Sequence, residues 1–473
     1  MDVDIAIVGS GFSGLGLGVR LRQEGIEDFV VLERGDGVGG TWHYNTYPGC
    51  ACDVPSHLYS FSFAPNPDWT RTYSRQPEIR AYLERVAERV RDRIRLKCEV
   101  RDARWDGARW NLQTSDGPVR ARVLVAGTGP LVEPRFPDFP GLERFQGVKM
   151  HSARWDHSVD LRGTRVASIG TGASAIQYVP RIAPEVDQLY VVQRTPPWVM
   201  PHSARPISRL ERRVFRRFPL AQRALRTGIY ATRELLVLGM VKYPPGMKLL
   251  ERAGRRHMER ALKDPELIAK ATPDYTAGCK RILPSNDWYP ALARENVELV
   301  TKGVAEVRER SIVLTDGREL EVDALVFGTG FQVLDMPVGR LVRGRDGRTL
   351  AEVWNGSPRA HLGVTVPGFP NFFMMMGPNT GLGHTSVVYM IEAQIAYVLD
   401  ALHTGAHTVE VRPEVVERFH AEVQRRMRGT VWSTGCKSWY QDEQGNNPTL
   451  WPDWTWRYRQ RTARFKDEEY VVT

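Results

Sequence analysis

Three glycines near the start of the chain have the spacing of a phosphate-binding turn. Gly9, Gly11 and Gly14 separate an apolar strand pattern from a helix pattern in "DIAIVGSGFSGLGLGVRLRQEGIEDFVVLER", which ends at Glu33 and Arg34. The first glycine permits a tight turn, the second lets a pyrophosphate approach the backbone, and the third lets helix and strand pack closely. The helix N-terminus attracts the phosphate charge, and Glu33 suits a ribose hydroxyl. The segment therefore predicts a dinucleotide-binding unit.

A second unit of this kind begins with Gly170-x-Gly172-x-x-Ala175 in "RVASIGTGASAIQYVPRIAPEVDQLYVVQRT". Arg194 follows its first glycine by 24 positions, the same offset that separates the first glycine of the earlier unit from its ribose-binding acid. A cation at this place suits a 2′-phosphate, so the second unit is expected to prefer NADP over NAD. The alternative is that Arg194 merely solvates the end of a strand.

The elements around these motifs predict an α/β fold in which one nucleotide unit is nested in the other. Two more strands end in Gly-x-Gly turns, at Gly127 and Gly129 and at Gly328 and Gly330, and these turns bracket the second fingerprint. We expect two Rossmann-like dinucleotide-binding domains, with a helical insertion in the nested one. The predicted ranges are 1–140 for the first part of the outer domain, 141–325 for the nested domain, about 203–275 for its helical insertion, and 326–473 for the second part of the outer domain.

The charge of the chain is concentrated in the expected helical insertion. The formal net charge is +10, and residues 205–260 alone contain 15 Lys and Arg against 4 Asp and Glu. No nucleic-acid-binding signature accompanies this excess, so no nucleic-acid partner is expected. We interpret the segment as a solvated helical face, with a weak peripheral contact to an anionic membrane surface as the alternative.

The remaining composition is that of an ordinary globular chain, with 42% hydrophobic and 25% charged residues. No apolar run reaches the roughly 20 residues of a membrane span, and the start of the chain lacks a signal-peptide pattern. A cytoplasmic location is therefore expected. The five cysteines are too few and too scattered for a disulfide framework, and no metal site is expected.

The segment "FQGVKMHSARWD" (145–156) lies between the two units and has no clean helix or strand period, so it is expected to be a connector. Its residues Phe145, Gly147, His151, Trp155 and Asp156 resemble the complete fingerprint of type I Baeyer–Villiger monooxygenases. The related flavin-containing monooxygenases usually lack the Trp-Pro/Asp ending. A second family signature resembles "GTWHYNTYPGCACD" (40–53), and the resemblance extends over the whole chain.

The resemblance implies FAD in the outer domain and NADP in the nested one. It implies oxidation of a ketone with O₂ to an ester or lactone through a flavin C4a-peroxide, as in other enzymes whose cofactor carries the difficult chemistry. In that family an Arg matching Arg281 stabilises developing negative charge, and Asp53 would orient it. Lys280 matches a contact to the NADP phosphate or ribose, Trp439 matches a mobile loop that closes the site, and His151 matches a hinge residue rather than a general base.

The predicted catalytic residues are thus Arg281 and Asp53. The predicted cofactor contacts are Gly9, Gly11, Phe12, Ser13, Gly14, Glu33, Arg34, Gly40, Thr41, Trp42, Asp53, Tyr59, Val100, Gly170, Thr171, Gly172, Ala173, Ser174, Gln177, Arg194, Thr195, Lys280 and Trp439. Two alternatives stay open: a flavin monooxygenase that oxygenates sulfides or amines, and, more distantly, a flavoprotein that binds partners without catalysis. The identity of the ketone and the oligomeric state do not follow from the sequence.

Overall fold

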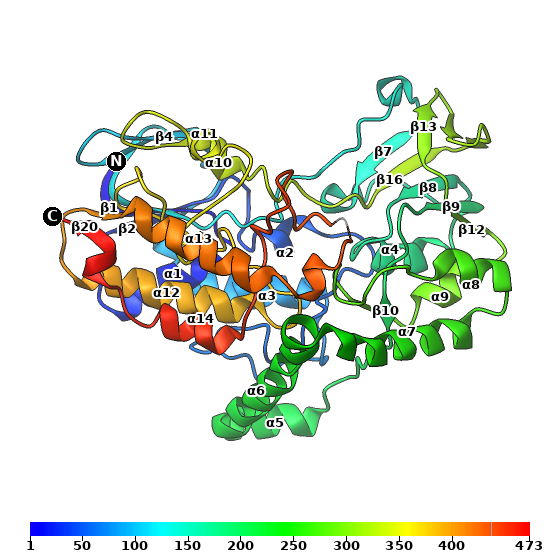
Figure 1. Cartoon of the computed structure of the whole chain (residues 1–473), viewed down its shortest axis with the longest axis horizontal. Helices are drawn as coiled ribbons and strands as arrows, with labels where there is room; N and C mark the ends of the chain where they lie inside the picture. The colour runs from blue at the N-terminus through cyan, green and yellow to red at the C-terminus, as the bar shows by residue number, and fades with distance from the viewer. Residues whose placement is uncertain (437) are drawn as a thin grey trace.

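Two β-sheets organise the chain, and a computed structural model describes residues 1–436 and 438–473 of it (Figure 1). The larger sheet has eight strands, and a parallel arrangement of β6, β1, β2 and β3 forms one side of it. Its strands in spatial order are β17 (Val342–Arg343), β4 (Val100–Trp105), β5 (Trp110–Thr114), β6 (Val119–Ala126), β1 (Asp2–Val8), β2 (Phe29–Leu32) and β3 (Ile94–Arg95), with β18 (Phe372–Met374) also beside β6.

Helices cover this sheet and bury its central strands. Helix α1 (Phe12–Gln23) packs against α12 (Val387–His403) and α3 (Gln76–Ala87). All four residues of β2 are buried, as expected for a parallel strand that is covered on both faces. Because α12 comes from the end of the chain, the outer domain is built from both ends of the sequence.

The second sheet has five strands, and all of them are parallel. Their spatial order is β12 (Val297–Val300), β9 (Gln188–Val192), β8 (Arg165–Ile169), β16 (Ala324–Phe327) and β7 (Val148–His151). Helices α4 (Ala175–Ile182) and α9 (Trp288–Leu292) pack together beside it, and β13 (Val304–Val307), β14 (Ser311–Leu314) and β15 (Glu319–Glu321) form a small antiparallel sheet. The chain enters this sheet at β7 and leaves it at β16, which confirms the predicted nesting.

The segment 145–156 is not simply a connector. Val148–His151 form β7, the edge strand that pairs in parallel with β16. The four-residue strand is too short for its alternation to be recognised in the sequence, and its partner lies more than 170 residues further along the chain.

A helical insertion leaves the nested domain, as predicted, and its helices α5 and α6 project from the lower edge of the molecule in Figure 1. It consists of α5 (Arg209–Arg217), α6 (Pro219–Glu234), the π-helical turn η4 (Leu238–Lys242), the 3-10 turn η5 (Pro244–Met247), α7 (Lys248–Ala261) and α8 (Pro265–Ala271). A parallel pair of short strands, β10 (Val199–Met200) and β11 (Leu283–Pro284), flanks the insertion on either side. Residues 280 and 281 therefore lie just before β11, which begins at Leu283 and pairs with β10.

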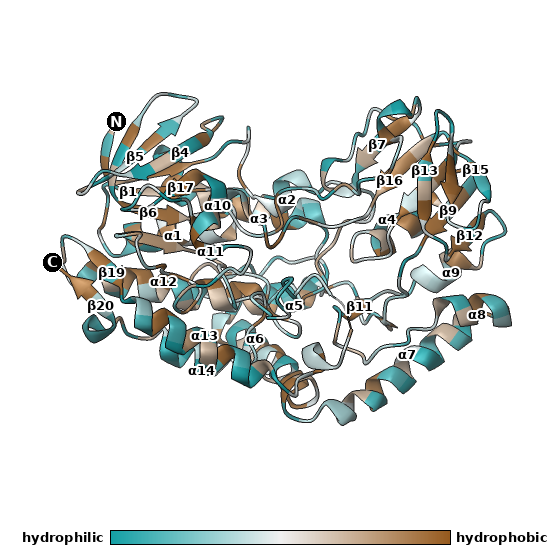
Figure 2. Cartoon of the chain, turned by 45° about the horizontal axis from the view of Figure 1, so that its top comes forward, coloured by the Kyte–Doolittle hydropathy of each residue, from teal (hydrophilic) through white to brown (hydrophobic). Residues whose placement is uncertain are grey.

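The remaining elements complete the outer domain. They are α2 (Thr41–Tyr44), α10 (Pro337–Leu341), α11 (Leu350–Trp354), α13 (Pro413–Met427), α14 (Thr455–Arg461), β19 (Val409–Val411) and β20 (Tyr470–Val472). Short 3-10 turns are η1 (Glu88–Arg93), η2 (Leu142–Arg144), η3 (Ser152–Arg154), η6 (Val431–Ser433) and η7 (Asp467–Glu469). Figure 2 shows hydrophobic strands inside both sheets and largely hydrophilic surfaces on α7 and α14. Within the described ranges, no helix combines the length and apolar character needed to cross a bilayer.

Candidate active site

The first glycine turn has the geometry that its spacing predicts. Gly9 has a φ of +100°, and a Cβ at this position would lie 2.8 Å from the carbonyl oxygen of Gly127. A Cβ on Gly14 would overlap the carbonyl oxygen of Gly9. The turn between β1 and α1 therefore admits only glycine at these two positions.

The N-terminus of α1 faces a second glycine backbone. Gly11 caps the helix without any side-chain hydrogen bond, and a Cβ on Gly11 would find the Cα of Gly40 at 3.6 Å as its nearest neighbour. Glu33 is buried at the end of β2, where Ser10 donates its backbone N–H and its hydroxyl to Oε2 at 2.9 and 2.7 Å. The Gly35 N–H donates to Oε1 of Glu33 at 2.8 Å. Two glycine backbones and a fixed carboxylate thus surround the helix terminus.

Aromatic side chains pack behind this terminus. The ring of Phe12 lies edge-on to that of Tyr59, with the centroids 5.0 Å apart, and Trp42 donates its indole N–H to the Tyr59 hydroxyl at 3.1 Å. Ser13 and Val100 are buried, and Thr41 is half-buried. Arg34 forms an ion pair with Glu133 at 2.6 Å. The cofactor contacts predicted for these side chains stay predictions.

The nested domain repeats the arrangement at the N-terminus of α4. Gly170 has a φ of +103°, and Gly172 and Ala173 are exposed; a Cβ on Gly172 would meet nothing within 4 Å. The Thr171 hydroxyl donates to the Thr195 carbonyl at 3.2 Å, and Ser174 precedes the helix without forming a side-chain cap bond. The first turn of α4 is therefore open to a ligand.

Two cations border this open turn. Arg194 is exposed at the end of β9, and its positive charge, after burial, is the second cause that lowers the pKa of Lys280. The Lys280 ammonium also lies 4.9 Å from the centre of the Tyr275 ring. Within the described part of the chain, neither cation forms an ion pair of 4.0 Å or less. Two neighbouring cations without an ion-pair partner have the charge that a phosphate dianion requires, and their predicted contact to the NADP phosphate stays a prediction.

Gln177 lies where the two domains meet. Its Oε1 accepts from the Tyr47 hydroxyl and from the Ala51 N–H, both at 3.1 Å, and its Nε2 donates to the Ala51 carbonyl at 3.0 Å. The side-chain amide is thus engaged by the outer domain. Its predicted cofactor contact stays a prediction, and the interdomain bond is a role that sequence reasoning missed.

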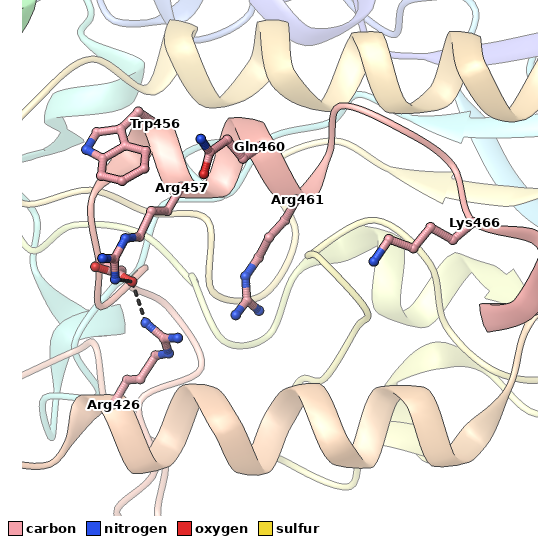
Figure 3. A pocket seen from close by; sticks show the side chains of 7 residues that line it. Arg426, Trp456, Arg457, Gln460, Arg461 and Lys466 are labelled. Atoms are coloured by element: carbon pink, nitrogen blue, oxygen red, sulfur yellow. Dashed lines mark hydrogen bonds and ion pairs between the residues drawn. The ribbon is translucent and has the colours of Figure 1, made fainter.

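A recess of about 530 Å³ between α13 and α14 is separate from these features (Figure 3). Arg426, Arg457, Arg461 and Lys466 are among the residues that line it, with Asp453 beside them. Arg426 and Arg457 form ion pairs with Asp453. None of Arg281, Asp53 and Lys280 lines this recess, so it is not the candidate active site.

The predicted catalytic pair is formed in the structure. Arg281 donates through Nε to Oδ2 of Asp53 at 2.7 Å and through Nη2 to Oδ1 at 2.8 Å, a bidentate contact between residues 228 positions apart. The Arg281 side chain is 34% exposed, so it remains accessible. The Asp53 charge raises the pKa of Arg281, and although burial opposes ionisation of Asp53, Arg281 holds the pKa of that carboxyl below its ordinary value. Both groups are therefore charged at neutral pH.

A C-terminal segment lies near this pair. Tyr440 is buried, and its pKa is raised to about 12, mainly by burial, with Arg281 and Asp53 close enough to influence it. Trp439, the residue predicted to lie on a closing loop, is 46% exposed and packs against Tyr440 with a centroid distance of 4.3 Å. Tyr440 was missed by sequence reasoning, because nothing in the sequence distinguishes it from the other tyrosines.

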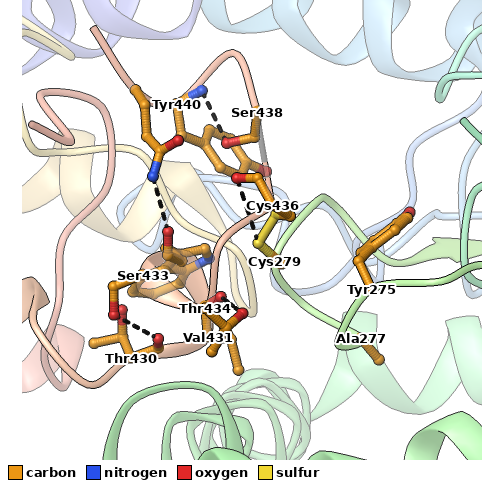
Figure 4. Close-up of a disulfide and its surroundings, with 12 residues drawn as sticks. Tyr275, Ala277, Cys279, Thr430, Val431, Ser433, Thr434, Cys436, Ser438 and Tyr440 are labelled. Atoms are coloured by element: carbon orange, nitrogen blue, oxygen red, sulfur yellow. Dashed lines mark hydrogen bonds between the residues drawn. A yellow bond between two sulfur atoms is a disulfide. The ribbon is translucent and has the colours of Figure 1, made fainter. Parts of the chain in front are cut away.

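A disulfide links the same C-terminal segment to Cys279, the residue directly before Lys280 and Arg281 (Figure 4). Cys279 and Cys436 are bonded, with their Cα atoms 6.4 Å apart and 157 positions between them in the sequence. Cys50, Cys52 and Cys98 are free and buried. The sequence predicted no disulfide framework, and the scattered positions of the cysteines gave no indication of this single bond.

The fingerprint residues lie at the edge of the nested sheet. A Cβ on Gly147 would overlap both the Asp323 carbonyl oxygen and the Phe145 ring, so glycine is required there. The exposed carboxylate of Asp156 accepts from the Ser158 N–H at 2.9 Å, and the ring of Trp155 lies 5.6 Å from that of Tyr178. These contacts are local and structural.

His151 is buried at the C-terminal end of β7. Its Nδ1 accepts from the Ala153 N–H at 3.1 Å, and its ring packs against Phe136 and Phe331. Burial lowers the pKa of His151 to about 4, although the Gly330 backbone lies close enough to favour the protonated ring. A ring that is neutral and enclosed at neutral pH fits a packing or hinge role better than that of a general base.

Comparisons with known proteins agree with this geometry. A family model described as pyridine nucleotide-disulphide oxidoreductase matches residues 6–234. The chain is 53% identical to a Baeyer–Villiger monooxygenase of Streptomyces coelicolor, over 99% of this chain and 92% of that protein. It is 52% identical to a Baeyer–Villiger monooxygenase of Pseudomonas aeruginosa, over 99% of this chain and 91% of that protein.

Solved structures give the same result. An oxidised steroid monooxygenase bound to NADP has a TM-score of 0.87 and 32% identity, and a closed cyclohexanone monooxygenase has a TM-score of 0.89 and 29% identity. Each comparison covers 100% of this chain and 99% of the other. The chain therefore belongs to the Baeyer–Villiger monooxygenases, flavoenzymes that use FAD and NADPH.

Proposed function

We propose that the chain converts a ketone and O₂ into an ester or lactone and water at the Arg281–Asp53 pair, with NADPH as the electron donor. The observation that carries this proposal is the bidentate ion pair, which is partly exposed and lies near Tyr440. Three separate parts of the chain supply these residues, so the pair exists only in the assembled molecule. Its similarity to Baeyer–Villiger monooxygenases and to a cyclohexanone monooxygenase supports a ketone as substrate.

The outer domain fits FAD. The bare N-terminus of α1, the facing backbones of Gly11 and Gly40, and the buried carboxylate of Glu33 match the pyrophosphate and ribose of a dinucleotide. When bound, the flavin supplies the activated oxygen atom, and the protein orients the reacting groups and excludes water.

The nested domain fits NADP, and we propose that it extends from residue 141 to the end of β16 at Phe327 rather than to 325, because β16 belongs to the nested sheet. The open turn at Gly172 and the N-terminus of α4 would accept the pyrophosphate. Arg194 and Lys280 would accept the 2′-phosphate, since their mutual repulsion is relieved when a dianion lies between them. This arrangement favours NADPH over NADH.

Arg281 provides a permanent positive charge where negative charge develops on oxygen during the reaction. A guanidinium keeps its proton at any pH at which the protein is folded, and here the Asp53 charge strengthens that preference. Asp53 fixes the plane of the guanidinium through two hydrogen bonds, so the donor needs no reorientation during the reaction. Nη1 lies 3.5 Å from the Leu382 carbonyl and is the nitrogen that Asp53 does not engage.

The experiment combines purified, FAD-loaded protein with NADPH, ¹⁸O₂ and a panel of cyclic, linear and aryl ketones plus one thioether. Mass spectrometry should show one labelled oxygen atom in the product of at least one ketone. Oxygenation of the thioether alone would contradict the proposal and favour sulfide oxygenation. A cytoplasmic location is proposed with this function, because NADPH is regenerated there.

A further inference from the structure

One face of helix α6 is exposed and almost uncharged. Its exposed residues are Pro219, Leu220, Arg223, Ala224, Leu225, Thr227, Gly228, Ala231, Thr232 and Leu235, and Arg223 is the only charged one. Leu220 is 74% exposed and Leu235 is 59% exposed. Intervals of three and four residues place Leu220, Ala224, Gly228 and Ala231 in one row along α6, and the row continues past its end at Glu234 with Leu235 and, in η4, Leu238; these six residues are here called the apolar stripe.

The opposite face of α6 is anchored to the outer domain, so the stripe is held outward. Gln222 donates to the Asn66 carbonyl at 2.7 Å, and Arg226 donates to the Ser60 carbonyl at 2.6 Å. Glu234 is buried and accepts from the Thr455 hydroxyl at 2.6 Å. The helix therefore cannot rotate to bury its apolar side without breaking this set of buried bonds.

Apolar exposure is concentrated in this part of the molecule. Eight of the sixteen large hydrophobic side chains that are exposed in the described ranges lie between Leu210 and Leu249. Besides those on α6 they include Phe218, Tyr243 and Leu249, which flank the stripe at both ends. Clustered exposure of this kind marks an interaction surface, whereas scattered exposure does not.

The helices before and after the stripe in the sequence carry exposed cations without an ion-pair partner in the described part of the chain. Exposed Arg209, Arg213 and Arg217 lie on or next to α5, and exposed Lys248 and Arg252 lie on α7. None of these five forms an ion pair of 4.0 Å or less within the described part of the chain. Between residues 205 and 260, Glu259 is the only fully exposed acidic residue.

We propose that the face formed by α5, α6 and α7 docks on a membrane surface that contains anionic lipids. The stripe would enter the boundary between head groups and acyl chains, and the cations on α5 and α7 would contact lipid phosphates. A second copy of this chain fits less well, because it would bring the same cations and only one exposed acid, Glu259, to pair with them. The arrangement combines the two features that membrane surfaces recognise, apolar area and positive charge.

Docking would bring the reacting centre close to the membrane. Next to Glu234, Arg233 donates to the Tyr73 hydroxyl at 3.1 Å, and its charge contributes to the low pKa of Asp53. The C-terminal end of α6 therefore reaches the neighbourhood of the catalytic pair, while its exposed face carries the stripe.

The test measures co-sedimentation of the FAD-loaded protein with phosphatidylcholine vesicles that contain 0 or 30% phosphatidylglycerol. We expect binding to the anionic vesicles that weakens with added salt, and little binding to the neutral ones. Leu220→Glu/Leu235→Glu and, separately, Arg213→Glu/Arg217→Glu should each lower the partition coefficient at least tenfold. Val471→Glu, at an exposed hydrophobic position outside the insertion, is the matched control and should bind as the wild type does.

Flavin content and turnover of a water-soluble ketone should be unchanged in all variants, which separates docking from folding and from catalysis. Absence of binding to anionic vesicles would overturn the proposal, as would wild-type binding by the stripe variant. A concentration-dependent dimer that Leu220→Glu/Leu235→Glu dissociates, without vesicle binding, would assign the face to a second copy instead.

Discussion

The chemistry of this molecule depends on a few charged residues whose partners are far away in the sequence. Arg281 is held by Asp53 through two of its three nitrogens, which leaves one edge of the guanidinium available. Its neighbour Lys280 is directed instead toward Arg194 and the Tyr275 ring. We propose that these two consecutive cations serve two different sites, one for developing negative charge and one for the phosphate of the electron donor.

Arg281→Ala should abolish product formation from a ketone. Removal of one preorganised donor typically costs 10²–10³ in rate, and loss of a full charge should cost at least as much. Flavin reduction by NADPH should slow but continue, and FAD should remain bound. Stopped-flow absorbance with product quantification separates these steps. Asp53→Asn should be milder, because it leaves the cation in place without its bidentate partner, and product formation near the wild-type rate in Arg281→Ala would contradict the assigned role.

Arg194→Ala should weaken the use of NADPH much more than that of NADH. A charge-assisted hydrogen bond contributes about 1.5–3 kcal/mol, which corresponds to roughly a 10- to 100-fold rise in the KM for NADPH. Arg310→Ala, which removes an exposed cation of the same domain, is the control and should change neither the KM for NADPH nor the KM for NADH. Steady-state KM values for both donors provide the measurement. Equal losses with NADPH and NADH would show that Arg194 does not contact the 2′-phosphate.

Sequence reasoning succeeds for residues whose role is local. Gly9 and Gly170 are identified by spacing because the turn itself needs a positive φ at each, and Gly14 because a Cβ there would overlap the carbonyl oxygen of Gly9. Asp53 could be paired with Arg281 only through resemblance to a family, and Tyr440 was not identified at all. The reason is physical: these contacts are created by folding, and no local pattern encodes a distance between residues that are more than 100 positions apart.

At the scale of elements, β7 shows the same limit. Its four residues form the edge of a sheet, and their partner β16 completes the nested domain. Val148–His151 form a strand because they pair in parallel with Ala324–Phe327. The sequence of the segment alone resembles that of a connector. In contrast, β1, α1 and β2 follow one another directly and were predicted in order.

The His151→Ala variant should fold and retain FAD. Its turnover should be slower, and it should form less product for each NADPH that it oxidises. The enclosed ring connects the end of β7 to Phe136 and Phe331, so its loss should loosen the junction between the domains. His151→Asn preserves an acceptor for the Ala153 N–H and should recover part of the coupling. The ratio of product formed to NADPH oxidised provides the measurement. A variant that fails to fold or to hold flavin would identify His151 as a packing residue only.

The disulfide between Cys279 and Cys436 should constrain the C-terminal segment that contains Tyr440 and lies near Arg281. Iodoacetamide labelling of the denatured, unreduced protein should modify three cysteines, and labelling after reduction should modify all five. Cys279→Ser and Cys436→Ser should each lower the free energy of unfolding by about 2–4 kcal/mol. The double variant should lose no more than either single one, because both remove the same bond. Cys98→Ala, at a free buried cysteine, is the control, and additive losses would argue against the bond.

At the scale of the whole molecule, the helical insertion is as important as the two nucleotide domains. It leaves the nested domain yet packs on the outer one, where Gln222 contacts the His57 ring at 3.2 Å and Phe215 lies 4.9 Å from it. The order of the domains was predictable, because each fingerprint marks its own strand and helix. How the insertion packs was not, since it depends on side chains such as His57 that have no distinguishing pattern.

His57 should make this packing sensitive to acid. Burial lowers its pKa to about 4, whereas an unfolded chain has a His pKa of about 6.5. Below pH 6.5 the unfolded state therefore binds a proton that the folded state does not, so stability falls as the pH drops and the loss is complete near pH 4. The total is roughly 3 kcal/mol, with a maximal slope of about 1.4 kcal/mol per pH unit. Urea midpoints between pH 7.5 and 5 should show this contribution in addition to that of buried His151, and the total slope should be smaller in His57→Gln, which keeps an acceptor for Gln222. His403→Gln, at an exposed histidine, should leave the slope unchanged, and an unaltered slope in His57→Gln would refute the assignment.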